Sequence, residues 1–237
     1  MIEAFVTNLG KYNEGRLQGE YLKLPATTEE VQALFSRIGL DGIMYEEMFI
    51  TDYETEVSGL KQHLGEYESL NELNYLASLL EEMDEGELEK LEAAIAQGEY
   101  AGSVQELINL TQNLDCYDFY SDVNDYEDLG HYLIEELGYE TIPEHLQHYF
   151  DYESYGETHV INEGGEILKG GGFIFHNDEP FTEIYKGRAD LPEEHKIFAY
   201  PPMEKSISKA IAQFKQKISE IPEKLTPERL TPAHADR

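Results

Sequence analysis

The sequence has little cysteine, no tryptophan and no long hydrophobic run. Its one cysteine, Cys116, excludes an internal disulfide framework. No positively charged leader with an apolar core precedes the first strand-like segment, and no window approaches the roughly 18 apolar residues that a membrane span needs. These features lead us to expect a cytoplasmic protein that has no membrane partner.

Basic residues are also scarce. The chain has 17 Lys and Arg against 49 Asp and Glu, which gives a formal net charge of -32 at pH 7. Proteins that bind nucleic acid need a basic patch that displaces counterions from the phosphates. Only one segment has a basic character, and it contains Lys205, Lys209, Lys215 and Lys217. We therefore expect no direct binding of nucleic acid.

Apolar and aromatic residues are present in the amounts typical of a folded protein. Hydrophobic residues make up 41% of the chain, and its 10 Phe and 17 Tyr are spread along the sequence. Disordered chains lack both features, because they cannot bury enough apolar surface to offset the lost conformational entropy. The negative charge must therefore lie on a folded surface, and the mixture of strand and helix patterns predicts the α+β class.

The acidity is regional. Residues 1–185 hold 41 acidic and 7 basic side chains, whereas residues 186–237 hold 8 and 10. Between Lys61 and Lys169 the only Lys or Arg is Lys90, set against 27 Asp and Glu. Solubility requires a net charge of only about 2 to 8 for a small domain, and a larger charge destabilises the compact state by self-repulsion. A halophilic protein would be poor in lysine throughout, whereas the last 52 residues are not.

The amount of charge matches a protein-sized piece of DNA. B-DNA carries one negative charge per ~1.7 Å of axis, so some thirty charges correspond to about 15 base pairs. The sequence therefore favours a DNA mimic, in which a surface of carboxylates replaces phosphates and blocks DNA-binding enzymes.

The first sixty or so residues have the pattern of a small α/β unit. Residues 1–9 alternate apolar and polar side chains, residues 17–24 can pair with them, and residues 48–50 supply another short strand. Thr27 and Glu30 form a capping box that begins a helix, and Gly39 ends it. The inward face of this helix is expected to contain Val31, Leu34, Phe35 and Ile38.

Three further capping boxes predict helices in the middle of the chain, and they pair Ser69 with Glu72, Asp84 with Glu87, and Ser103 with Glu106. The inward faces are expected to be Leu70, Leu73, Leu76, Ala77 and Leu80 in the first helix and Leu88, Leu91, Ala94 and Ile95 in the second. The outward positions are expected to be Glu72, Glu81, Glu82, Glu85, Glu89 and Glu92.

Acids alternate with aromatic residues over 115–128, a segment expected to begin as a strand and end as a helix. That helix is expected to continue through Leu129, Tyr132, Leu133 and Leu137 and to end at a left-handed Gly138. Another helix is expected after Thr141, with Pro143 at its first position, Glu144 completing a capping box, and Leu146, Tyr149 and Phe150 facing inward.

Glycines separate two or three expected strands at 159–163, 173–176 and 181–185. One amphipathic helix is expected after Pro202, with an apolar face made of Ile207, Ala210, Ile211, Phe214 and Ile218. Pro222, Pro227 and Pro232 then indicate a loose tail.

The motifs predict no catalytic, cofactor or metal site. A calcium loop that starts at Asp118 or Asp122 would lack the required glycine and glutamate. His145 and His148 lack the His-Glu-x-x-His order of a zinc helix, and Cys116 lies near acids that disfavour a thiolate. Carboxylate pairs can perform acid and base chemistry, but with 49 acids in the chain any one pair is uninformative.

Particular strings nevertheless carry a family resemblance. They are LGKYNEG at 9–15 followed by Leu17 and Gly19, ITDYE at 50–54, SLNELNYL at 69–76, HYLIEELG at 131–138, and PEHLQHYFDYESYG at 143–156. In this order they resemble the ArdA family of antirestriction proteins over roughly residues 1–186.

The resemblance implies an elongated chain of three small α/β or α domains, with an added C-terminal helix in this sequence. The corresponding ranges are 1–61 for an α/β domain, 62–113 for an acidic helical domain, 114–186 for an α+β domain that dimerises, and 187–237 for the extension. It also implies a homodimer that inhibits type I restriction-modification enzymes by imitating DNA. The antirestriction segment or dimer interface would include Leu129, Tyr132, Leu133, Glu136, Gly138 and Pro143.

The expected DNA-mimic surface combines the acids of the middle helices with those that follow them. It comprises Glu72, Glu81, Glu82, Glu85, Glu89, Glu92, Asp115, Asp118, Asp122, Asp125, Glu127, Asp128, Glu135 and Glu136. Two alternatives stay open from the residues alone. The same surface could inhibit another DNA-binding target such as a CRISPR effector, or the protein could be an enzyme that uses a carboxylate pair.

Overall fold

The computed structural model describes residues 2–202 and 211–216, and its contacts divide the chain into two compact units, Met1–Tyr200 and Pro201–Arg237. In the second unit, residues 211–216 are helical, and Ile211 and Phe214 are exposed. The other positions of the predicted apolar face (Ile207, Ala210 and Ile218) and the three tail prolines lie outside the described residues.

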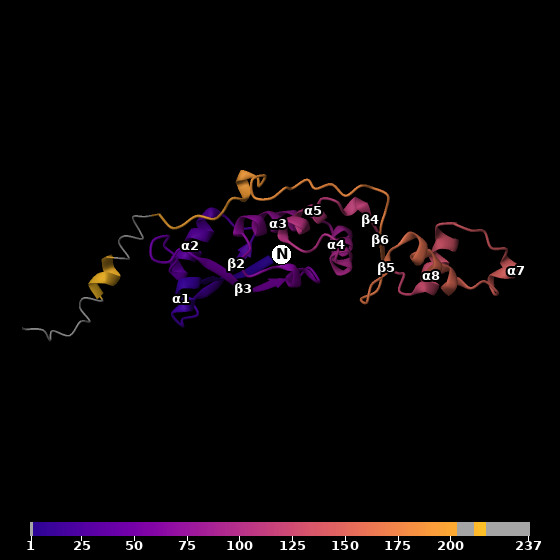
Figure 1. The fold of residues 1–237 in the computed structure, drawn as a ribbon, viewed down its shortest axis with the longest axis horizontal. Coiled ribbons are helices and arrows are strands. Elements are labelled where there is room, and N and C mark those ends of the chain that lie inside the picture. Colours follow the sequence, from indigo (N-terminus) through magenta and orange to yellow (C-terminus); the bar gives the residue numbers. More distant parts are fainter. Residues whose placement is uncertain (1, 203–210, 217–237) are drawn as a thin grey trace, which may run out of the picture. The chain divides into compact units, whose positions relative to one another are not determined.

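The first unit begins with a three-stranded antiparallel sheet in the order β2-β1-β3 (Figure 1). β1 (Ile2–Asn8) pairs with β2 (Gly19–Leu24) on one side and with β3 (Met48–Thr55) on the other, and α1 (Leu9–Asn13) follows β1. Alternate residues of β1 are buried, as expected when successive side chains point to opposite faces. The three predicted strands are confirmed, although β3 extends well beyond Ile50.

α2 (Thr28–Ile38) packs against this sheet as the sequence predicts. Thr27 and Glu30 form a reciprocal capping box, Gly39 ends the helix with φ 78°, and the four predicted apolar positions are buried. At its C-terminus, the Lys11 ammonium and the Asn8 side-chain amide both donate to the Ile38 carbonyl oxygen. These contacts satisfy a carbonyl that has no partner inside the helix, and the cation suits the negative end of its dipole.

The middle of the unit consists of α3 (Leu70–Glu82), α4 (Glu85–Gln97) and α5 (Val104–Thr111). The predicted inward faces of α3 and α4 are buried, except that Leu88 is half-buried. The capping box of Asp84 and Glu87 is confirmed. Ser103 caps α5, but the Glu106 carboxylate accepts a hydrogen bond from the backbone N–H of Gly102 instead.

A second antiparallel sheet has the order β4-β6-β5, formed by β4 (Tyr117–Tyr120), β5 (Glu166–Ile167) and β6 (Phe173–His176). Because neighbouring residues of a strand face opposite sides, Ile174 packs into the large core of α3 to α5, whereas Phe173 packs into a second, small core. The second core contains Val123, Leu129, Leu133 and Phe173. This sheet therefore separates two cores.

α6 (Tyr126–His131) covers the small core and continues into a π-helical turn, Tyr132–Glu136, before the left-handed Gly138. The predicted strand-to-helix change over 115–128 is confirmed.

α7 (Glu144–Gln147) is only one turn long, and Pro143 caps it without a side-chain hydrogen bond, so the predicted capping box is wrong. The predicted inward residues are wrong as well, because Leu146 is 46% exposed, Tyr149 is 86% exposed and Phe150 is half-buried.

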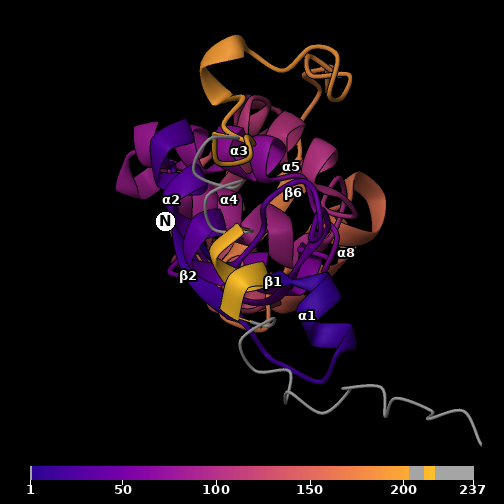
Figure 2. The ribbon, with the colours of Figure 1, turned by 90° about the vertical axis from the view of Figure 1, so that its left-hand side faces the viewer.

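Two of the three strands predicted beyond residue 158 are wrong. Residues 159–163 belong to α8 (Tyr152–Glu163), and residues 181–185 pair with no strand. Residues 177–200, which we name the C-terminal strap, run back over α5 and α3 toward α2 (Figures 1 and 2). Short 3-10 turns occur at Leu60–His63, Leu114–Cys116 and Glu193–His195. Within the described ranges, no helix has both the length and the apolar content to cross a membrane.

Candidate functional site

α6 and α8 cross at two glycines, which allow their backbones to touch. A Cβ atom on Gly130 would lie 2.0 Å from the Tyr152 carbonyl oxygen, and one on Gly156 would lie 2.1 Å from the Tyr126 carbonyl oxygen. No larger side chain fits at such distances without moving backbone. The His131 ring also stacks on Tyr152, with centroids 3.7 Å apart. The two helices therefore form a tightly joined pair, named here the α6–α8 pair.

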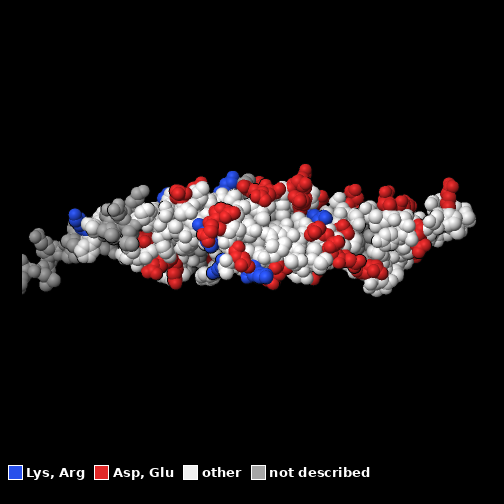
Figure 3. Space-filling view, turned by 90° about the horizontal axis from the view of Figure 1, so that it is seen from above, with Lys and Arg blue, Asp and Glu red and all other residues white. Residues whose placement is uncertain are grey.

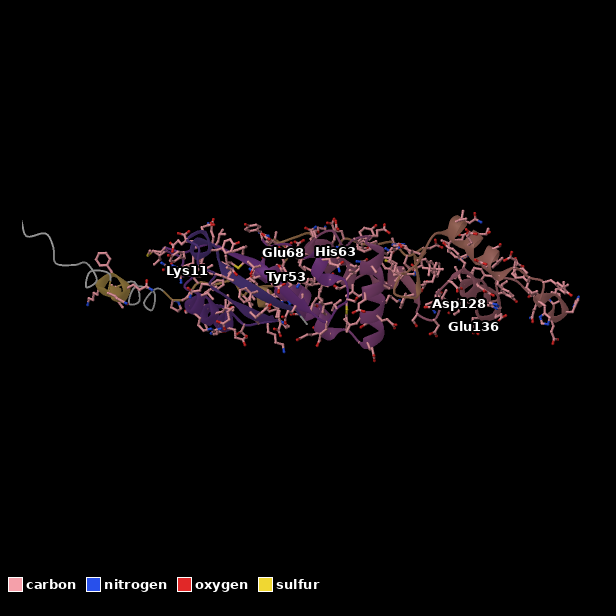
Figure 4. All side chains as sticks on the ribbon, turned by 90° about the horizontal axis from the view of Figure 1, so that it is seen from below. Lys11, Tyr53, His63, Glu68, Asp128 and Glu136 are labelled. Atoms are coloured by element: carbon pink, nitrogen blue, oxygen red, sulfur yellow. The ribbon has the colours of Figure 1, made fainter. Side chains whose placement is uncertain are left out.

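The α6–α8 pair displays most of its acids to solvent. Figure 4 labels two of the predicted site residues, Asp128 in α6 and Glu136 in the π-helical turn. The exposed predicted residues in this part of the chain are Asp122, Asp125, Glu127, Asp128, Glu135 and Glu136. Of these, Glu135 accepts a hydrogen bond from the His131 ring, with 3.0 Å between Oε1 and Nδ1.

Sequence reasoning missed the acids of α8, because it assigned residues 159–163 to a strand. α8 has no continuous apolar stripe, since only Tyr152 and Gly156 are buried. Its exposed carboxylates are Asp151, Glu153, Glu157 and Glu163. The available signal was local: Asp151 three residues before Ser154 is a helix cap, and Glu153 and Glu157 have helical spacing.

Hydrogen bonds at the starts of the two helices fix the orientation of two of these carboxylates. Asp125 accepts a hydrogen bond from the backbone N–H of Asp128 at 2.8 Å. Asp151 accepts from the backbone N–H and the hydroxyl of Ser154, and these bonds lower the pKa of Asp151. Both helices therefore begin with a carboxylate at the end where negative charge is favourable.

The acids of α3 and α4 form a second exposed group. Glu81, Glu82, Glu85 and Glu89 are exposed as predicted. Glu92 is half-buried and accepts from the backbone N–H of Ser58 at 2.7 Å. Farther along, Asp115 is exposed and Asp118 is half-buried, with its carboxylate 3.4 Å from the side-chain amide of Asn177.

Glu72 does not belong to this surface, although the sequence placed it there. It is only 7% exposed, and its carboxylate accepts from the Tyr185 hydroxyl at 3.0 Å and from Arg188 Nε at 2.9 Å. Ser69 consequently makes no side-chain cap of α3, so the predicted capping box of Ser69 and Glu72 is wrong. The outward position predicted for Glu72 is wrong for the same reason.

Cations are distributed unevenly over the unit. In the N-terminal sheet and its helix, Arg37 makes a bidentate contact with Glu20 and lowers the pKa of that carboxyl. Among described residues between 73 and 168, the only contact of ion-pair geometry joins the His131 ring and Glu135, and the one lysine, Lys90, donates to the Tyr117 carbonyl oxygen. Figure 3 shows red side chains across the visible face and no blue ones where it passes over the α6–α8 pair.

The residues of the predicted dimer segment are divided between core and surface. Leu129 and Leu133 are buried in the protomer's small core, and Tyr132 packs against Tyr120 with ring centroids 4.5 Å apart. Glu136, Gly138 and Pro143 are exposed. Near them lie large apolar side chains that the described unit leaves uncovered, namely Leu137, Tyr139, Leu146, Tyr149 and Ile161.

The structure also places the residues considered for other chemistry. In the described part of the chain, no three His, Cys, Asp or Glu side chains are grouped to bind a metal ion. His145 and His148 are exposed, whereas Cys116 is buried. Burial and the nearby Asp115 carboxylate raise the pKa of the Cys116 thiol, so the predicted role as a small core residue is confirmed.

A comparison with protein families finds one match that covers most of the chain. The model described as "Antirestriction protein (ArdA)" matches residues 4–173. The matched range contains both sheet regions, the helices α1 to α8 and the first residue of β6, and it ends before the C-terminal strap. A search of curated proteins finds no match.

Proposed function

Because this chain belongs to the ArdA family of antirestriction proteins, we propose that it inhibits type I restriction-modification enzymes by occupying their DNA-binding groove. The observation that supports this proposal is the exposed set of carboxylates between residues 81 and 166, which meets almost no neutralising cation among the residues that the structure describes. These carboxylates would contact the Lys and Arg side chains that otherwise hold phosphates.

The proposed surface consists of three groups on different elements. The first is the α3–α4 group (Glu81, Glu82, Glu85, Glu89 and Glu92), the second lies around β4 (Asp115, Asp118 and Asp122), and the third is the α6–α8 pair with its π-helical turn. Carboxylates at positions i and i+4 of a helix repel one another by about 0.2–0.5 kcal/mol. The arrangement therefore costs stability, which fits a surface used for binding a cationic groove.

The summed charge gives the proposed mechanism its strength. Residues 62–168 carry 27 acids and one lysine, and B-DNA carries two charges per base pair, so this segment matches about 13 base pairs. When the target releases its bound anions to accept such a surface, binding becomes steeply dependent on salt. Affinity then resides in many weak contacts instead of a few strong ones.

We further propose that the protein acts as a homodimer. The uncovered apolar side chains beside α7 and α8 support this proposal, because contiguous exposed apolar surface commonly marks an interface. A dimer would join two charged surfaces into a longer track.

We also propose the three-domain division 1–61, 62–113 and 114–186 for the matched part, and a cytoplasmic location where restriction enzymes act.

Competition with DNA tests the function directly. A purified type I restriction-modification complex is bound to a labelled duplex, and the protein is added at salt concentrations from about 50 to 200 mM. We expect displacement of the duplex, with an inhibition constant whose logarithm rises linearly with the logarithm of salt concentration. A flat salt dependence, or simultaneous binding of both ligands, would contradict DNA mimicry. If the protein displaced DNA from a CRISPR effector but not from the restriction-modification complex, the effector would replace that complex as the proposed target.

A further inference from the structure

The C-terminal strap is held by asparagine side chains that imitate the pairing of a strand. Asn109 accepts from the backbone N–H of Tyr185 and donates to its carbonyl oxygen, both at 2.8 Å. Asn113 does the same for Thr182, at 2.8 and 3.0 Å. Each amide therefore satisfies both hydrogen-bonding groups of one strap residue, as a neighbouring β-strand would.

These two asparagines are buried, with exposed fractions of 2% for Asn109 and 4% for Asn113. A buried amide without partners is costly, because it loses its hydrogen bonds to water. Each side-chain amide also donates to a backbone carbonyl oxygen of α5, Asn109 to that of Gln105 and Asn113 to that of Asn109. The side-chain oxygen of Asn109 accepts from the strap, and that of Asn113 accepts from the strap and, at 4.0 Å, from the Cys116 thiol. The interior of α5 is thus built to receive the strap.

Glu72 adds a charged contact to the same face of the helices. The strap residue Tyr185 is 3% exposed and donates its hydroxyl proton to Glu72, while Arg188 pairs with the second carboxylate oxygen. A buried carboxylate that lacks such partners is costly, because it loses its hydrogen bonds to water. Glu72 therefore faces the strap and not a binding partner.

The far end of the strap binds the N-terminal part of the unit. Asn71 Oδ1 accepts from the backbone N–H groups of Ile197 and Phe198, at 2.8 and 2.7 Å. Beyond them, Gln32 in α2 donates to the Tyr200 carbonyl oxygen, and the Phe198 ring lies 5.2 Å from that of Phe35. The strap leaves β6 and thus reaches the end of α5, then α3 and then α2 (Figure 1).

We propose that the C-terminal strap is a brace that fixes the placement of the second sheet, and with it the α6–α8 pair, relative to α2 and the N-terminal sheet. Asn109, Asn113 and Glu72 are its positioning residues. Its effect on inhibition rests on the proposed function, since a fixed spacing of carboxylates matters only if they imitate phosphates. The brace itself does not depend on that function.

A distance measurement tests the brace independently of inhibition. Spin labels are attached to Glu29→Cys at the start of α2 and Glu163→Cys at the end of α8, two exposed positions, in a Cys116→Ala background. The distance distribution is compared between the full chain and the Asn109→Ala/Asn113→Ala variant. We expect at least a twofold broader distribution in the variant, with unchanged far-ultraviolet circular dichroism. The matched control is Gln105→Ala, which removes only an exposed strap contact to Glu183 and should leave the width unchanged.

An unchanged width in the Asn109→Ala/Asn113→Ala variant would overturn the brace, even if that variant melts at a lower temperature. Should it fail to fold, Tyr185→Phe/Arg188→Ala removes the contacts to Glu72 instead, and the same criterion applies. If the proposed function holds, the broadened variant should inhibit about fivefold more weakly with the same salt slope, because its surface charges are intact. If the variant shows the broader distance distribution but the full chain does not compete with DNA, the brace is supported and the proposed function is contradicted.

Discussion

The N-terminal sheet with α2 and the α6–α8 pair carry their acids in opposite ways. In the first region, Arg37 pairs with Glu20, and Lys61 pairs with Asp52. In the second, no Lys or Arg among the described residues pairs with a carboxylate, and the one contact of ion-pair geometry joins Glu135 to the His131 ring. The first region also belongs to the large core, whereas the second covers a core of four buried residues.

This difference shows that carboxylates without a Lys or Arg partner lie even where the fold has little apolar burial to offset their repulsion. A stability requirement alone would favour the opposite distribution, because self-repulsion opposes compaction. The α6–α8 pair packs on a small core, and the close backbone contact at Gly130 and Gly156 holds its two helices together. The comparison therefore points to a charged surface maintained for binding, and four sets of substitutions test it.

The largest effect on stability is expected from Gly130→Ala. A Cβ atom at this crossing meets the Tyr152 backbone and must push the helices apart, which should cost about 3 kcal/mol. Hydrogen exchange should show lost protection over residues 126–163 and retained protection in the N-terminal sheet. Gly170→Ala is the matched control, since nothing lies within 4 Å of its added atom. Equal protection in Gly130→Ala and the parent would show that the crossing does not define this region.

Removing charge from the α6–α8 pair should have the largest effect on inhibition. The variant carries Glu→Gln changes at Glu127, Glu136, Glu153, Glu157 and Glu163, which are all exposed. At about 0.5 kcal/mol for each lost contact, inhibition of the restriction enzyme should weaken about 50- to 100-fold, and the salt slope should fall. Titration of the competition assay measures both.

The control for this variant changes five exposed glutamates of the N-terminal region to glutamine, namely Glu29, Glu46, Glu47, Glu54 and Glu66. Both variants lose five negative charges, so their long-range electrostatic attraction to the enzyme falls by a similar amount. We expect a several-fold smaller loss of inhibition. Equal losses in the two variants would mean that total charge, and not its location, determines binding.

A smaller effect separates two helix starts with the same sequence signature. Thr27→Ala removes a real cap of α2 and should reduce the free energy of unfolding by about 1 kcal/mol. Ser69→Ala at the start of α3 should change it by about 0.2 kcal/mol or less, because Ser69 makes no cap hydrogen bond. Urea denaturation of both variants measures the difference. An equal loss of unfolding free energy in the two variants would indicate that Ser69 caps α3, as the sequence predicted.

The smallest effect concerns pH. Partial burial opposes ionisation of Asp41, but hydrogen bonds from the backbone N–H groups of Tyr45, Ile43 and Met44 outweigh it and lower the pKa of this carboxyl. A lowered pKa stabilises the fold above the unfolded-state value of about 3.9, and this stabilisation is lost as pH falls through the folded value. Asp41→Asn should therefore cost about 0.5 kcal/mol at neutral pH, allowing for solvent screening.

Urea unfolding between about pH 2 and pH 6 checks this sign, since the gap between parent and Asp41→Asn should close as the parent's carboxylate is protonated. Asp151 has a lowered pKa in the α6–α8 pair and should show the same direction in Asp151→Asn. A gap that widens on acidification would contradict the assigned hydrogen bonds.

Local patterns predicted the elements in which one stretch of chain buries one face. β1 alternates, α2 carries its apolar stripe between Thr27 and Gly39, and the large core takes up the predicted face of α3. Patterns failed where burial depends on distant residues. Val160 and Ile161 suggested a strand by composition, yet they lie in a helix in which Ile161 is 75% exposed. Residues 181–185 pair with no strand, and asparagine side chains satisfy the backbone of Thr182 and Tyr185 instead.

The sequence by itself determined where the charge lies along the chain, which segments have caps and apolar stripes, and the resemblance to the antirestriction family. These properties depend on composition and on neighbours a few residues apart. The tertiary structure decided that Glu72 turns inward, that α6 and α8 meet at glycines, and that residues 177–200 cross three helices. Such contacts join positions up to 168 residues apart, and no local periodicity encodes which of them are brought together.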